Sequence, residues 1–87
     1  MPSYQALLKV DLSKGQFEDE FAVCGLDFEN REFSFFVNKD FVVNDQIRVL
    51  VVEEEGDLVL VRLPAKTFDN GATVTVRKPL ISVLQQV

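Results

Sequence analysis

Two apolar runs separated by a short acidic segment form the clearest pattern in this chain. Residues 47–52 read IRVLVV, residues 53–57 read EEEGD, and residues 58–63 read LVLVRL. β-Branched residues favour strands, and a Gly-Asp pair between two such runs favours a tight turn. We therefore predict a β-hairpin over residues 47–63 with an acidic turn at its tip. Aliphatic side chains occupy both of its faces, so both faces require cover.

Apolar and polar residues alternate with a period of two in several other segments, which is typical of half-buried strands. The pattern predicts strands over residues 4–12, 17–23, 26–28, 32–37 and 73–77. The first two should pair through a turn at residues 13–15, although Asp19 interrupts the alternation of the second strand. Further turns are predicted at residues 29–31 and 69–71. After Pro79 the spacing of Leu and Val fits either a last strand or a short helical turn.

The spacing of these elements predicts an all-β fold. Turn signals recur about every 8–12 residues, and no segment reads as a long helix. A chain of 87 residues suits a single domain spanning residues 1–87. We predict a small SH3-like barrel of six or seven short antiparallel strands, with an OB-type five-stranded barrel as the alternative.

Composition limits how such a small domain is stabilised and where it works. Cys24 is the single cysteine and there is no histidine, so disulfides and structural zinc are not expected. Hydrophobic residues make up 47% of the chain and include eight Phe, enough for a packed core. One unpaired cysteine and the lack of a secretory leader predict a reducing, cytoplasmic setting. Apolar runs are far shorter than the roughly 20 residues of a membrane span, so we predict a soluble protein without a membrane partner.

The charge is strongly negative and unevenly distributed. The net charge is −5, with 13 acidic and five basic side chains in residues 1–57 but one acidic and four basic side chains in residues 58–87. A negative chain is poorly suited to bind a phosphate backbone, which makes nucleic acid an unlikely partner. We expect the uneven distribution to reflect solvated faces with local variation in charge; the alternative is an acidic and a basic end that could stack head to tail or bind an acidic partner.

Residues that carry catalysis or bind cofactors are scarce. The commonest general base is absent because there is no histidine, and Cys24 has no basic neighbour to activate it. The four glycines are isolated, so no phosphate-binding loop is present, and residues 53–57 lack the ligand spacing of a calcium loop. We predict no enzyme activity, no catalytic residue, no cofactor and no metal site.

The hairpin supplies the candidate binding surface. If Ile47, Val49 and Val51 face the core, the alternate side chains must point away from it. Each aliphatic side chain left in water forgoes roughly 1.5–3 kcal/mol of burial, so this outer face needs a cover. The cover is either the C-terminal segment, residues 80–87, or a partner. The predicted partner-binding residues are Phe36, Leu50, Val52, Leu58 and Leu60, with Arg48 and Arg62 at the rim.

These observations predict a protein–protein interaction or assembly module, with a homodimer as one form of the contact. The alternative is a small nucleic-acid-binding barrel that uses the basic C-terminal third. Its predicted residues are Arg62, Lys66, Arg77 and Lys78. Four phenylalanines cluster in residues 33–41, but acidic residues bracket them, so we expect core packing there instead of base stacking.

Overall fold

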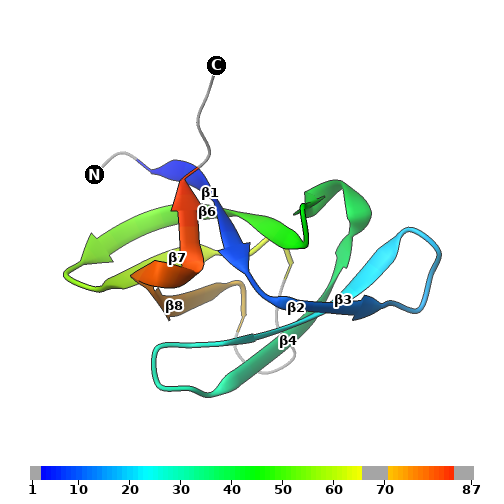
Figure 1. Cartoon of the computed structure of the whole chain (residues 1–87), viewed down its shortest axis with the longest axis horizontal. Helices are drawn as coiled ribbons and strands as arrows, with labels where there is room; N and C mark the ends of the chain where they lie inside the picture. The colour runs from blue at the N-terminus through cyan, green and yellow to red at the C-terminus, as the bar shows by residue number, and fades with distance from the viewer. Residues whose placement is uncertain (1–2, 66–70, 84–87) are drawn as a thin grey trace.

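The protein is built almost entirely of short antiparallel strands (Figure 1). The computed structural model describes residues 3–65 and 71–83. The strands are β1 (Tyr4–Lys9), β2 (Asp11–Lys14), β3 (Glu20–Leu26), β4 (Glu32–Asn38), β5 (Val42–Val43), β6 (Gln46–Glu55), β7 (Leu58–Arg62), β8 (Thr73–Arg77) and β9 (Ile81–Val83). Two 3₁₀ turns, η1 (Lys39–Phe41) and η2 (Lys78–Leu80), precede β5 and β9. The all-β prediction is confirmed, with nine strands in the described residues where six or seven were predicted.

The strands form two sheets and not a closed barrel. The first sheet has the order β8-β7-β6-β1-β9, with β5 pairing to β6 as well, and the second has the order β2-β3-β4. A backbone hydrogen bond from the Phe28 N–H to the Thr75 carbonyl, at 2.9 Å, joins the β3–β4 loop to the edge strand β8. The closed barrels predicted from the turn spacing are therefore not formed, and neither the SH3-like nor the OB-type arrangement is confirmed.

The N-terminal segment changes sheets at Val10, which the alternation did not reveal. Residues 4–9 pair with β6 and residues 11–14 pair with β3, so the predicted single strand over 4–12 is two strands. The predicted turn at 13–15 is wrong as well, because the connection to β3 extends over residues 15–19 and places Phe17 in a loop. Likewise, Leu26 ends β3 and Phe28 lies in the following turn, so no separate strand forms there.

The predicted hairpin is confirmed as β6 and β7. Gly56 at its tip adopts a positive φ of 59°, which glycine tolerates without steric cost. The three glutamates are not in the turn but continue strand β6. Val51 pairs with Val61 and Glu53 pairs with Leu60, so Val52 is the extra residue of a β-bulge.

One core lies between the two sheets and receives side chains from both. Its largest fully buried side chain is Phe35, and the Phe33 and Phe35 rings stack with centroids 6.3 Å apart. The other buried members are Ala6, Leu8, Val23, Val37, Ile47, Val49, Val51, Val59, Val61, Leu63 and Val76. Burial of each larger aliphatic side chain stabilises the fold by roughly 1.5–3 kcal/mol.

The sequence predicted either a last strand or a short helical turn after Pro79, and the structure contains a 3₁₀ turn followed by a strand. Pro79 lies in the first turn of η2, and Ile81–Val83 then forms β9 beside β1. Among the described residues, no helix is long and apolar enough to cross a membrane.

Candidate protein-binding surface

The outer face of the β6–β7 hairpin carries four partly exposed aliphatic side chains, which we call the outer hairpin face. Both strands turn the residues predicted to face the core inward. These residues are buried, and they are Ile47, Val49, Val51, Val59 and Val61. The alternate residues are half-buried on the opposite side of the sheet, and they are Leu50, Val52, Leu58 and Leu60. The predicted inward and outward assignment of the hairpin is thus confirmed.

The bulge at Val52 changes which glutamate faces solvent. Because one extra residue reverses the alternation, Glu54 falls on the same side of the sheet as Val51 and opposite Val59. Tyr4, which pairs with Val51, donates its hydroxyl hydrogen bond to Glu54 Oε1. This hydrogen bond, burial and the negative charge of Glu54 together raise the pKa of Tyr4 to about 12. Glu53 and Glu55 remain on the outer side with Leu58 and Leu60.

A hollow at one end of the outer hairpin face carries two arginines, and we call it the basic hollow. Its volume is about 340 Å³, and its lining includes Leu50, Leu63 and Pro64 along with Arg48 and Arg62. The 3₁₀ turn η1 forms one wall, where the Arg48 guanidinium lies 5.8 Å from the centre of the Phe41 ring. Arg48 Nη2 also donates to the Asp40 carbonyl oxygen, which fixes the side chain against this wall. Arg62 forms no ion pair with any other described residue.

A second hollow, of opposite charge, lies at the other end of the same face. It has a volume of about 270 Å³ and is lined by Leu58, Leu60, Glu53, Glu55 and, from neighbouring elements, Phe28 and Thr75. The outer hairpin face therefore runs from a basic hollow to an acidic one over an aliphatic centre.

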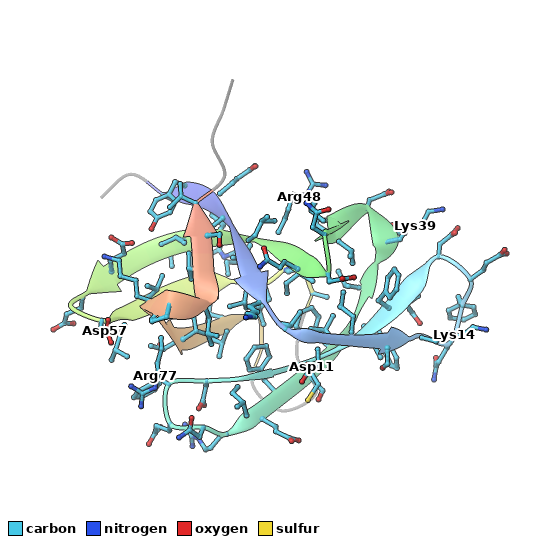
Figure 2. All side chains as sticks on the ribbon, viewed as in Figure 1. Asp11, Lys14, Lys39, Arg48, Asp57 and Arg77 are labelled. Atoms are coloured by element: carbon cyan, nitrogen blue, oxygen red, sulfur yellow. The ribbon has the colours of Figure 1, made fainter. Side chains whose placement is uncertain are left out.

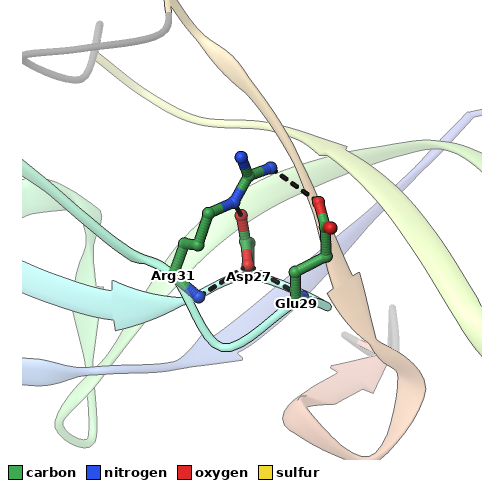
Figure 3. Close-up of polar contacts among 3 residues, drawn as sticks. All are labelled: Asp27, Glu29 and Arg31. Atoms are coloured by element: carbon green, nitrogen blue, oxygen red, sulfur yellow. Dashed lines mark hydrogen bonds and ion pairs between the residues drawn. The ribbon is translucent and has the colours of Figure 1, made fainter.

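Asp27 fixes the β3–β4 loop through contacts with Glu29 and Arg31 (Figure 3). The same loop carries Phe28, which lines the acidic hollow. Asp27 Oδ1 accepts the backbone N–H groups of Glu29 and Arg31 at 2.8 and 2.9 Å, and Arg31 also bonds Asp27 Oδ2 and Glu29 through its guanidinium. Burial alone would raise the pKa of Asp27, but the hydrogen bonds from Arg31 and Glu29 and the charge of Arg31 outweigh it, so the pKa is lowered. Asn30 completes the turn with a positive φ of 63°.

Phe36 does not belong to the outer hairpin face. It lies on β4 in the second sheet, opposite Ala22 of β3, and is half-buried. Its neighbours Phe35 and Val37 point into the core, so the predicted outward direction of Phe36 is right, but the surface it reaches is that of the other sheet. The structure brings Leu50, Val52, Leu58 and Leu60 together with Arg48 and Arg62 and leaves Phe36 apart.

The C-terminal segment does not cover the hairpin within the part of the chain that is described. Strand β9 lies at the edge of the first sheet beside β1, where Ile81 pairs with Leu8 and Val83 with Ala6. Leu80 and Ile81 pack against the core from that edge. Strand β1 separates β9 from β6 in the sheet, so residues 80–83 extend the sheet sideways.

Of the basic residues of the alternative prediction, the three that the structure describes do not gather into one patch. Arg62 and Arg77 mark opposite ends of the β7–β8 ladder, because Arg62 pairs with Thr73 and Arg77 with Leu58. Figure 2 shows Arg48 and Arg77 well separated. Lys78 follows Arg77 in η2, and its backbone N–H bonds the Asp57 carbonyl. Lys66 lies outside the described residues.

A third hollow, of about 350 Å³, lies beside Val10, where the chain passes from the first sheet to the second, and Cys24 is part of its lining. Its lining also includes Lys9, Asp11, Leu26 and Glu32. Across residues 3–65 and 71–83 there is no group of three or more His, Cys, Asp or Glu side chains placed to hold a metal ion.

Sequence reasoning missed Phe28 and the Tyr4–Glu54 pair, and the core packing expected of Phe41 is wrong, because Phe41 is 38% exposed in η1. Phe28 was expected in a strand over residues 26–28 but lies half-buried in a turn, and the polar residues around Phe28 and Phe41 are the sequence signal for both positions. The pairing of Tyr4 with Glu54 depends on the bulge, which has no local signature. No protein-family model, curated protein or solved structure matches this chain.

Proposed function

We propose that this protein is a protein–protein interaction or assembly module that binds its partner through the outer hairpin face. The observation that supports this most directly is the partial exposure of Leu50, Val52, Leu58 and Leu60 in the middle of the larger sheet. Apolar centres with charged rims are the usual composition of such contacts, and arginine is enriched in them. Arg48 and Arg62 occupy that rim.

The finer features predicted from the sequence belong to the same proposal. An SH3-like relationship is supported by the spacing of the turns and by two antiparallel sheets that share one core. A cytoplasmic role is supported by Cys24, a free cysteine.

Comparative affinity capture tests the proposed function. Tagged wild-type protein and the variants Leu60→Asp and Arg62→Glu are exposed to an extract of the cells that produce the protein. Proteins that bind through the outer hairpin face are expected in the wild-type capture and lost from both variants, since one variant puts a charge in the apolar centre and the other reverses the rim charge. Arg62 is exposed, so Arg62→Glu keeps the test valid if Leu60→Asp fails to fold.

Ser34→Asp provides the matched control. Ser34 is half-buried on the second sheet, opposite Cys24, so its substitution adds the same charge away from the hairpin. Proteins retained by Ser34→Asp but lost from Leu60→Asp bind the proposed face. If Leu60→Asp and Arg62→Glu both fold and capture the same proteins as wild type, the proposed function is wrong.

A further inference from the structure

Phe17 is exposed on a loop whose shape is fixed, which is unusual for a side chain of its size. Its exposure is 69%, above that of the other exposed large hydrophobic residues among those described. The β2–β3 loop that carries it projects from one side of the molecule (Figure 1). The Gly15 N–H bonds the Glu20 carbonyl at 3.0 Å, and the Glu20 N–H bonds the Phe17 carbonyl at 3.1 Å. The ring is thus held out in water by an ordered loop.

Gly15 and Glu20 account for the order of this loop. A Cβ at position 15 would lie 2.7 Å from the Glu20 carbonyl oxygen, so the two backbone segments approach as closely as only glycine allows. The Glu20 carboxylate also accepts the Gln16 backbone N–H at 2.9 Å. At the far end of the loop, Asp19 forms an ion pair with Lys39 at 3.1 Å. A loop held in this way loses little entropy when it binds.

The charges around Phe17 complement those of the basic hollow. Glu18 adjoins Phe17, is exposed and forms no ion pair with any other described residue. The basic hollow combines apolar walls with Arg62, which also forms no ion pair with any other described residue. Its volume of about 340 Å³ is at the low end of the roughly 300–1,000 Å³ of small-molecule sites. That size suits a single inserted side chain better than a large ligand.

We infer that Phe17 of one copy of this chain docks in the basic hollow of a second copy, with Glu18 beside Arg62. The inference rests on the proposed function, since the basic hollow is one end of the outer hairpin face. A second copy is the occupant because the chain itself carries the two complementary parts, an exposed ring beside a carboxylate and an apolar hollow beside an arginine, and neither charge forms an ion pair with another described residue. The contact joins two different surfaces, so it is heterologous and leaves a free loop at one end and a free hollow at the other.

Analytical ultracentrifugation with charge-exchange variants tests the pairing of Glu18 with Arg62. Wild type is expected to form species larger than the 9.9 kDa chain as concentration rises. Glu18→Arg and Arg62→Glu are each expected to weaken this association by about tenfold or more, because each places like charges together in the contact. The double variant keeps the net charge of wild type and is expected to restore the association. Arg77→Glu, at the other end of the β7–β8 ladder, is the charge control and is expected to leave it unchanged.

A mixing experiment tests the heterologous geometry. Phe17→Ser removes the inserted ring and keeps the hollow, whereas Leu50→Asp damages the hollow and keeps the ring. Each variant alone is expected to be monomeric, and their equimolar mixture is expected to form a dimer with one free loop and one free hollow. Leu26→Ser removes another exposed hydrophobic side chain, 46% exposed, and is expected to associate like wild type. If Leu50→Asp does not fold, Arg62→Glu replaces it in the mixture.

The outcomes separate this inference from the proposed function. A wild type that stays monomeric to about 1 mM, the range of weak contacts, overturns the inference, as does association that is unaffected by Phe17→Ser. A third outcome is that Leu50→Asp abolishes association and that mixing it with Phe17→Ser does not restore association. This outcome shows a symmetric contact and also overturns the inference. In each of these cases, capture that is lost from both Leu60→Asp and Arg62→Glu still supports a different protein partner at the outer hairpin face.

Discussion

Tyr4 offers a direct spectroscopic test of the bulge at Val52. The chain has one tyrosine and no tryptophan, so phenolate absorbance reports on Tyr4 alone. The bulge places Glu54 where it accepts the Tyr4 hydroxyl, and without the bulge Glu54 would lie on the opposite side of the sheet. The pH at which Tyr4 ionises therefore reports whether the bulge places Glu54 beside the Tyr4 hydroxyl.

The expected size of the effect follows from the three causes of the shift. The Tyr4 pKa is about 12 instead of its ordinary 10.0, through the hydrogen bond to Glu54, burial and the charge of Glu54, in that order. Glu54→Ala removes the hydrogen bond and the charge and leaves only burial. We expect the midpoint of Tyr4 ionisation to fall from about 12 most of the way toward its ordinary value.

The assay is an absorbance titration of folded protein from pH 8 to 13, with circular dichroism recorded on the same samples. Glu53→Ala is the matched control, because Glu53 is the adjacent glutamate but lies on the outer side, opposite Leu60. Its midpoint is expected to stay near that of wild type. Circular dichroism identifies the pH at which unfolding sets in, beyond which absorbance no longer reports on the native pair.

The same shift predicts how the Tyr4–Glu54 pair affects stability at high pH. Since the folded-state pKa is raised above that of the unfolded chain, the stabilisation is complete below about pH 10 and is lost as pH rises toward 12. The stability difference between wild type and Glu54→Ala should therefore shrink over this range. A folded wild type that ionises at its ordinary pH, with Glu54→Ala unchanged, would refute the bulge-dependent placement of Glu54.

Three further substitutions test the packing and the β3–β4 loop by chemical denaturation. Gly25→Ala should destabilise by about 1–3 kcal/mol, because a Cβ there would lie 2.5 Å from Phe33 Cζ; an unchanged midpoint would mean that the ring is not held against the glycine. Val61→Ala should cost about 2 kcal/mol because Val61 is fully buried, whereas Val83→Ala, at 61% exposure, should change stability little. Asp27→Asn should destabilise near neutral pH, and the difference should disappear as pH falls below the ordinary carboxyl pKa and through the lowered folded-state pKa of Asp27; a difference that persists in acid would assign the effect to something other than this carboxylate.

Local patterning was sufficient to predict the hairpin and its two faces. Alternation identified Val49, Val51, Val59 and Val61 as core residues, and all four are buried. The period of two depends only on backbone geometry within a strand, so it is readable without knowing the neighbours. The one-faced pattern of residues 73–77 succeeded for the same reason, since Val76 is buried while Thr73 and Arg77 are exposed.

Features that depend on how distant strands pair could not be read in the same way. The bulge at Val52 exists only relative to β7, and the sheet change at Val10 depends on β6 and β3 competing for one segment. For the candidate surface, the four aliphatic residues and two arginines were predictable from alternation. Phe36 was assigned to the same surface because alternation gives a direction but not a sheet, and its strand is in the other sheet.

Strand β1 lies between β6 and β9, and this position determines when the protein can fold during synthesis. Tyr4–Lys9 precedes both of its neighbours in the chain: its partners in β6 lie more than 35 residues further on, and those in β9 (Ile81–Val83) more than 70. The first sheet therefore cannot be completed until β9 has been synthesised. Until then one edge of β1 lacks its partner, and nascent chains pass through a stage in which that edge is open to other strands.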